Sequence, residues 1–144
     1  MTSKRVFSVF LVLLLVVVSA FAAKINLKDG IYGAQASEAS YGYTAFVMLE
    51  IDNGKIVKVV ADEVSADGKL KSNDEGYRAN MEPKTGTYPS KFYTDLAMQL
   101  LKEQNPDKVD IVSGATHATH NFVKLVKAIL EDGKLGQTIT VNLK

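Results

Sequence analysis

The sequence predicts a single α+β domain, built as an antiparallel sheet with two main helices packed on one face. The chain has 144 residues, 47% of them hydrophobic and 23% charged, which suits one globular core and leaves no room for a second. Alternating apolar residues in the first half predict strands, and apolar residues at helical spacing in the second half predict helices. Helices that each bury one face, beside a small sheet, are typical of α+β domains.

The first 22 residues resemble a secretory signal peptide more than a part of this fold. Lys4 and Arg5 precede an apolar run from Val6 to Val18, and Ala20-Phe21-Ala22 presents small residues where a signal peptidase cuts. We therefore expect residues 1–22 to be removed and residues 23–144 to form the domain. If the segment stays uncleaved, its apolar length approaches that of a membrane-spanning helix, and the protein would be anchored in the membrane.

The strands are predicted from alternation and one turn signal. Gly30 to Ala36, which is rich in glycine and alanine, is predicted as a first strand, and Thr44 to Ile51 places alternate apolar residues on one face of a second. The Asn53-Gly54 pair is typical of a tight hairpin turn, so Ile56 to Ala61 should return as the partner strand. A last strand is predicted from Thr138 to Leu143.

Two helices are predicted in the second half, one on either side of a short buried strand. The first carries its apolar stripe from Phe92 to Leu101 and ends at Asn105-Pro106. The second runs from Ala118 to Glu131, with Gly133 as a left-handed cap. Val109 to Val112 is interpreted as the buried strand, and Asp67 to Pro89 as a long irregular segment. Loops of this length inside a small domain are usually functional or disordered.

Composition excludes several function classes. Without Lys4 and Arg5, acidic side chains outnumber basic ones by one, so no basic surface favours nucleic acid. The chain has no cysteine, which excludes disulfides, thiolate-bound clusters and c-type haem attachment. Any redox chemistry must therefore come from a cofactor held by other atoms.

The candidate site lies in the run Asp110-Ile111-Val112-Ser113-Gly114-Ala115-Thr116. A Ser113-Gly114 turn would deliver the chain to the N-terminus of the second helix, where free N–H groups and the helix dipole favour a phosphate. Ala115 adds no bulk there, and Thr116 and Thr119 add hydroxyl groups. The alternative is an ordinary turn, in which Thr116 or Thr119 is only an N-cap.

The same run resembles the D-x-x-(S/T)-G-A-T signature of the FMN-binding domain family, known from subunits of the sodium-pumping NADH:quinone oxidoreductase and of ferredoxin:NAD oxidoreductase complexes. The opening Asp29 to Gly33, the hairpin at Gly54 to Ile56 and the helix after the signature are also similar to that family, so the resemblance covers most of Lys28 to Leu130. The chain is shorter than the complex subunits and is more similar to the short, exported, free-standing members.

The resemblance implies FMN, joined through its phosphate to Thr116 by a flavin transferase that takes FAD and releases AMP. Asp110, Ser113, Gly114 and Ala115 would form the recognition sequence. It further implies an electron carrier between unidentified donor and acceptor proteins in the periplasm or on the outer face of the cytoplasmic membrane, rather than a free-standing enzyme.

Other residues complete the set of candidates. Tyr77, Met81 and Tyr88 are apolar residues in the polar middle segment that could cover a flavin ring, or simply pack. His117 and His120 make an incomplete metal site, so we expect no metal. The alternatives are a noncovalent module for flavin or another phosphorylated ligand, or a structural surface protein without redox activity. No arrangement of serine, histidine and carboxylate residues supports a hydrolase.

Overall fold

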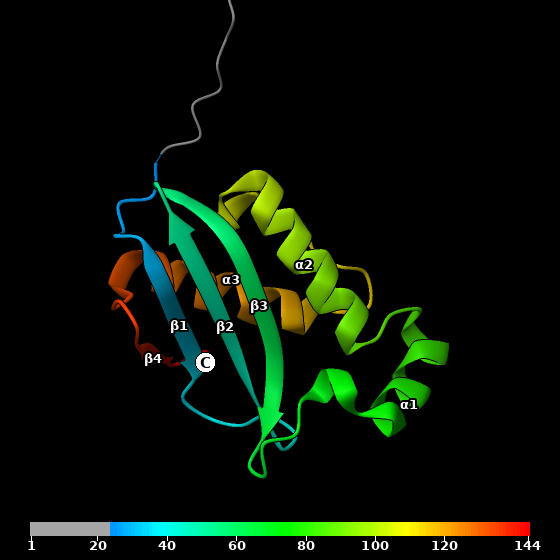
Figure 1. Cartoon of the computed structure of the whole chain (residues 1–144). Coiled ribbons are helices and arrows are strands. Elements are labelled where there is room, and N and C mark those ends of the chain that lie inside the picture. The colour runs from blue at the N-terminus through cyan, green and yellow to red at the C-terminus, as the bar shows by residue number, and fades with distance from the viewer. Residues whose placement is uncertain (1–23) are drawn as a thin grey trace, which may run out of the picture.

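The computed structural model describes residues 24–144, and the predicted signal segment lies outside them. The strands are β1 (Gly30–Ala36), β2 (Tyr43–Asp52), β3 (Lys55–Ser65) and β4 (Thr138–Val141); the α-helices are α1 (Glu75–Thr85), α2 (Pro89–Glu103) and α3 (Thr116–Asp132); and two 3-10 helices are η1 (Lys71–Asn73) and η2 (Pro106–Lys108). The strands form one sheet in the order β3-β2-β1-β4, which α2 and α3 cover on one face (Figure 1). The predicted α+β class is confirmed.

The β2–β3 hairpin forms where the sequence predicts it. Asn53 and Gly54 both have positive φ, at 49° and 72°, as a tight turn of this kind requires. The alternating apolar residues of β2 are buried, and Val47, Leu49 and Ile51 are each only 1% exposed. They pack against apolar residues of α2 and α3, namely Leu96, Leu100, Phe122, Leu125, Val126 and Ile129.

The sheet is mixed rather than fully antiparallel, because β4 lies parallel to β1 while the other two pairs are antiparallel. Helix α3 packs along β1 and β2 and returns the chain to the end where β1 begins (Figure 1). There Gly136 N–H donates to Ile31 and Gly33 N–H donates to Gln137. The direction of β4 therefore follows from the length and packing of α3. The alternation of apolar residues in β4 predicts a strand but carries no information about its direction.

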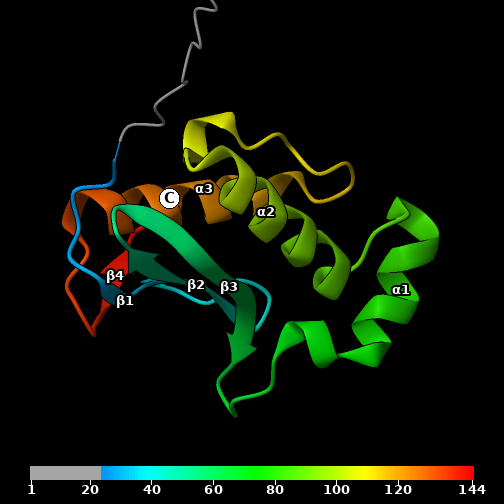
Figure 2. The same ribbon diagram turned by 45° about the horizontal axis from the view of Figure 1, so that its top comes forward.

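The expected irregular segment from Asp67 to Pro89 is wrong in its main part, because it contains η1 and the helix α1. The carboxylate of Asp74 accepts a hydrogen bond from Tyr77 N–H as the N-cap of α1, and Gly86 ends α1 in the left-handed conformation. Helix α1 buries none of its residues and has no marked apolar stripe, so periodicity did not reveal it. It stands to one side of the sheet, attached beyond the end of β3 (Figure 2).

Two local predictions before and after α3 are also wrong. Val109 to Val112 forms no strand, and Ile111 in its middle is 54% exposed. Gly133 has a φ of −57°, so it is not a left-handed cap. A side chain there would meet the carbonyl of Ile129 and the ring of Tyr32, so close packing explains this glycine.

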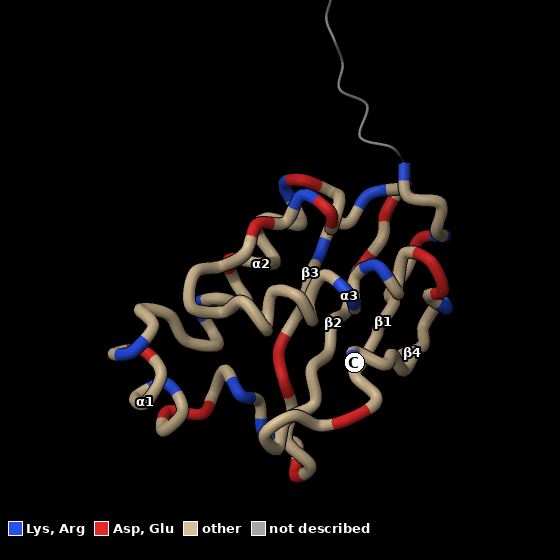
Figure 3. The backbone as a smooth tube through the Cα atoms, turned by 180° about the vertical axis from the view of Figure 1, so that it is seen from behind, with Lys and Arg blue, Asp and Glu red and all other residues tan. Residues whose placement is uncertain are grey.

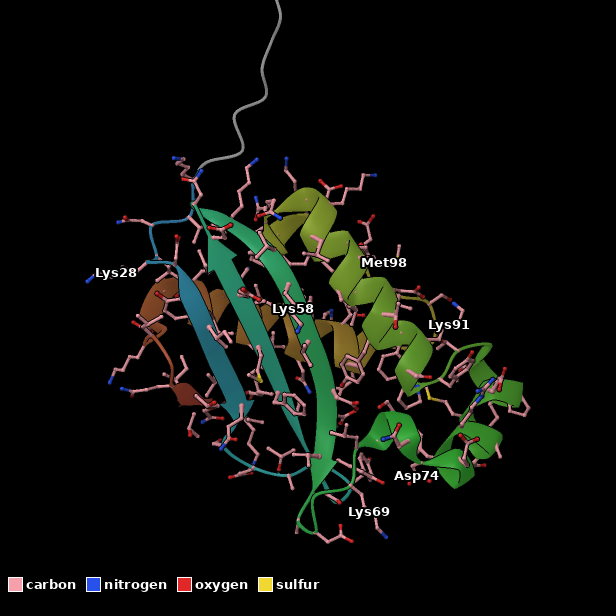
Figure 4. All side chains as sticks on the ribbon, in the orientation of Figure 1. Lys28, Lys58, Lys69, Asp74, Lys91 and Met98 are labelled. Carbon is pink, nitrogen blue, oxygen red and sulfur yellow. The ribbon has the colours of Figure 1, made fainter. Side chains whose placement is uncertain are left out.

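The opposite face of the sheet carries no helix of the described chain, and Lys58 projects from it (Figure 4). Partly exposed apolar residues of three strands share this face, among them Ile31, Met48 and Val60. Within residues 24–144, no helix has the length and apolar character needed to cross a membrane.

Candidate functional site

A cleft of about 390 Å³ lies where the start of α3 approaches α1 and the end of β3. Its volume falls within the range of about 300–1,000 Å³ that is usual for small-molecule sites. The lining residues come from segments far apart in the sequence: Gly114, Ala115, Thr116, His117, Ala118 and Asn121 from the turn before α3 and its start; Lys71, Tyr77 and Met81 from η1 and α1; Phe92 from α2; Ser40 and Tyr41 from the connection between β1 and β2; and Glu63 from β3. The fold thus brings Thr116 together with Tyr77 and Met81.

Thr116 is the first residue of α3 and is exposed on the wall of this cleft. The N-cap is Ala115, which provides no side-chain hydrogen bond to the helix. The N–H groups of the first turn therefore lack a side-chain acceptor and remain available to solvent or a ligand. An exposed hydroxyl beside free N–H groups and the positive end of the helix dipole suits a phosphate ester.

The turn before Thr116 has a tight geometry. Gly114 has a φ of +81°, and a Cβ there would lie 2.9 Å from both Cβ and the carbonyl oxygen of Thr85. The turn is closed by a hydrogen bond of 2.9 Å from Ala115 N–H to Val112. Glycine is therefore required both by the left-handed conformation and by the close approach of Thr85, the last residue of α1.

Thr119 does not line the cleft. It is 1% exposed; its hydroxyl donates to the carbonyl oxygen of Ala115 at 2.8 Å and accepts from Val112 N–H at 3.2 Å. Its hydroxyl therefore holds the turn that presents Thr116.

Asp110 and Ser113 are exposed and lie outside the cleft lining. The backbone of Asp110 is held from both sides by the Gln99 amide, which accepts from its N–H at 2.8 Å and donates to its carbonyl at 3.2 Å. This contact anchors the start of the motif to α2 and leaves the Asp110 carboxylate outside these two hydrogen bonds.

Helix α1 supplies Tyr77 and Met81 to the cleft and is positioned by Asp74 (Figure 4). The Tyr43 hydroxyl donates to the Asp74 carboxylate at 2.6 Å. This bond, together with Tyr77 N–H, lowers the pKa of Asp74, and the same bond raises the pKa of Tyr43 to about 12. Tyr88 lies elsewhere, with the Arg78 guanidinium 3.8 Å from its ring centre.

The two histidines separate. His117 lines the cleft, and its Nε2 lies 3.4 Å from the Asn121 side-chain nitrogen. His120 faces a different surface hollow with Val123 and Lys124. Within residues 24–144, no group of three or more histidine, cysteine or acidic residues is placed to hold a metal ion.

The sequence patterns did not single out a buried ion pair at the base of the cleft. Lys71 Nζ lies 3.1 Å from Glu63 Oε2, and the Tyr93 hydroxyl donates to the same oxygen at 3.0 Å. Burial, followed by the charge of Glu63, raises the pKa of Tyr93. Extending β3 to Ser65 would have indicated Glu63, because it pairs with the buried Ala45 and points to the same face.

Comparisons with known proteins agree with this geometry. The model of the FMN-binding domain matches residues 41–131, which include the signature and every residue that lines the cleft except Ser40. The "15 kDa lipoprotein" of Treponema pallidum is 34% identical over 113 residues, 78% of this chain and 80% of that protein. A crystal structure of a Clostridium perfringens protein has a TM-score of 0.76 at 28% identity and covers 82% of this chain and 99% of its own. A solution structure from Clostridium thermocellum has a TM-score of 0.53 at 27% identity and covers 77% of this chain and 96% of its own.

The family match spans well over half of the chain, and the residues that line the cleft fall almost entirely within it. The chain therefore belongs to the FMN-binding domain family.

Proposed function

We propose that this protein is an exported electron carrier that holds FMN through a phosphoester bond to Thr116. The position of Thr116 carries the proposal, because the last residue of the signature is exposed, begins α3 and lines a cleft of suitable volume. A buried threonine, or one turned away from the cleft, could not serve as an attachment point.

Attachment requires one group transfer. The Thr116 hydroxyl oxygen attacks the phosphorus on the flavin side of FAD, the bond between the two phosphates breaks, and AMP leaves while the hydroxyl proton is lost. A flavin transferase must reach the motif to do this. The exposure of Asp110, Ser113 and Thr116 supports such access.

The chain's own residues then hold and orient the cofactor. The first turn of α3 offers N–H groups to the phosphoester, and Tyr77, Met81 and Phe92 offer apolar and aromatic surface to the ring. When bound, FMN supplies one-electron and hydride chemistry, so the protein needs only to position it and shape its electrostatics.

The proposed location rests on the predicted signal segment and on the relative that is named a lipoprotein. Outside the cytoplasm a dissociated cofactor is diluted and lost. A covalent tether keeps it at high effective concentration near donor and acceptor proteins. This argument favours covalent over noncovalent binding for an exported carrier.

The deciding experiment compares Thr116→Ala with wild type, each co-expressed with a flavin transferase. Wild type should gain the mass of an FMN moiety and show flavin fluorescence in a denaturing gel. Thr116→Ala should show neither, because the nucleophilic oxygen is gone. Its stability should change by no more than ~1 kcal/mol, since Thr116 is exposed and is not the N-cap.

Thr119→Ala is the matched control, because it removes a hydroxyl from the same turn outside the cleft. It should keep covalent flavin, at a reduced yield if the turn loosens. If Thr116→Ala carries covalent flavin and Thr119→Ala does not, the assignment of the attachment point to Thr116 is wrong. If wild type never carries flavin, the carrier function is wrong, and colour lost on denaturation would instead favour the noncovalent module.

A further inference from the structure

A buried ion pair, Lys71 with Glu63, lies at the base of the cleft. The side chains of Lys71 and Glu63 are 8% and 12% exposed, and both residues line the same cleft as Thr116. Glu63 follows Asp62 near the C-terminal end of β3, where Figure 3 shows the acidic residues in red. Buried ion pairs seldom stabilise a fold more than apolar residues of the same size, because both charges must be removed from water.

The surroundings hold the ammonium group in a defined place. Lys71 Nζ contacts both carboxylate oxygens of Glu63, at 3.1 and 3.3 Å. It also lies 4.4 Å from the ring centre of Tyr77 and 5.3 Å from that of Tyr43. An aromatic face attracts a cation but does not neutralise its charge, and it does not accept a hydrogen bond from each of the three N–H groups. The electrostatic field of the Lys71 ammonium therefore still acts on the cleft.

The Glu63 carboxylate is fixed as firmly. The Tyr93 hydroxyl donates to Glu63 Oε2, and Tyr93 itself is 6% exposed in the core. Both charges therefore sit on η1 and β3 at set positions, where the low local dielectric makes their fields stronger than those of surface charges.

We propose that the Lys71–Glu63 pair sets the reduction potential of the flavin ring held in the cleft, which rests on the proposed function that the cleft binds FMN. Two-electron reduction with uptake of one proton leaves the ring with one negative charge. The Lys71 ammonium stabilises that charge and raises the potential, and the Glu63 carboxylate opposes it. The pair thus determines which donors and acceptors the carrier can serve.

The test measures midpoint potentials of flavin-loaded proteins, reduced with dithionite against a dye of known potential. Lys71→Met should lower the equilibrium constant for two-electron reduction at least tenfold, which is a shift of about 30 mV to more negative potential. Glu63→Gln should shift the potential in the opposite direction. Opposite signs from the two halves of one pair are not expected of a merely structural role.

Lys69→Met is the matched control. It makes the same change of charge two residues away, on a side chain that is 80% exposed and lies at the turn after β3 (Figure 4). Solvent screens a charge at this position, so the midpoint potential of the flavin in Lys69→Met should equal that of wild type.

Lys71→Met leaves Glu63 buried without its cation and can prevent folding. The double variant Lys71→Met/Glu63→Gln removes both charges, and its potential should fall between those of the two single variants. Wild-type potentials in the flavin-loaded Glu63→Gln and double variants would overturn the inference and leave the proposed function standing. A wild type without flavin would overturn the proposed function and this inference with it.

Discussion

Individual side chains at the start of α3 have separate tasks. Thr116 is presented to the cleft, Thr119 closes the preceding turn from inside, and Gly114 allows that turn to lie against Thr85. Replacing each residue should therefore change a different property: flavin attachment, the order of the turn, and folding.

Gly114→Ala should destabilise the protein by roughly 1–3 kcal/mol, because its positive φ is combined with contacts of 2.9 Å to Thr85. Gly136→Ala is the control, since Gly136 also has a positive φ, of 71°, but nothing lies within 4 Å of its added Cβ. The free energy of unfolding of Gly136→Ala should fall by only about 1 kcal/mol. Urea unfolding of the two variants measures the difference, and equal losses would show that the turn at Gly114 relaxes freely.

At the scale of elements, α1 differs from α2 and α3. It buries none of its residues, and it depends on the Asp74 cap at one end and Gly86 at the other. Such helices open locally at a small fraction of the global unfolding free energy. In this protein the weakly packed helix is also the one that supplies Tyr77 and Met81 to the cleft.

Attached flavin should therefore slow backbone hydrogen exchange in α1, because the ring adds apolar contact that the helix otherwise lacks. The comparison is between flavin-loaded wild type and flavin-free Thr116→Ala, with the buried middle of α3 as the internal reference. Equal exchange in α1 would remove Tyr77 and Met81 from the site.

At the scale of the whole molecule, one layer of two helices on one face of the sheet leaves the cleft at the end where β3, η1 and α3 meet. The first described residues lead into β1 at the opposite end of β3, where Ile25 N–H donates to Gly54 of the hairpin turn (Figure 1). The described residues that precede β1 are thus separated from the cleft by the length of the sheet.

Cleavage of the predicted signal segment, residues 1–22, should leave a protein that begins at or next to Ala23. The reason is that Ala20 and Ala22 place small side chains at the two positions that a signal peptidase recognises. Edman sequencing of protein recovered from the periplasm or medium tests this. A sequence starting at Met1 or Thr2 would mean that the protein keeps its apolar segment as a membrane anchor.

The features that could be predicted from the sequence are those encoded by near neighbours. Asn53-Gly54 determines the hairpin turn, alternation determines the buried face of β2, and helical spacing determines α2 and α3. The signature around Thr116 was sufficient to identify the family, because it is a contiguous run.

Only the tertiary structure decided the features that depend on distant residues. The parallel pairing of β4 with β1 depends on where α3 delivers the chain, and the need for glycine at 133 depends on the ring of Tyr32. The Lys71–Glu63 pair joins two polar segments whose local sequence resembles solvated surface. A local sequence pattern indicates whether each residue prefers to be buried or to form a turn. Which distant residue it contacts depends on how the whole chain packs, and no short stretch of sequence contains that information.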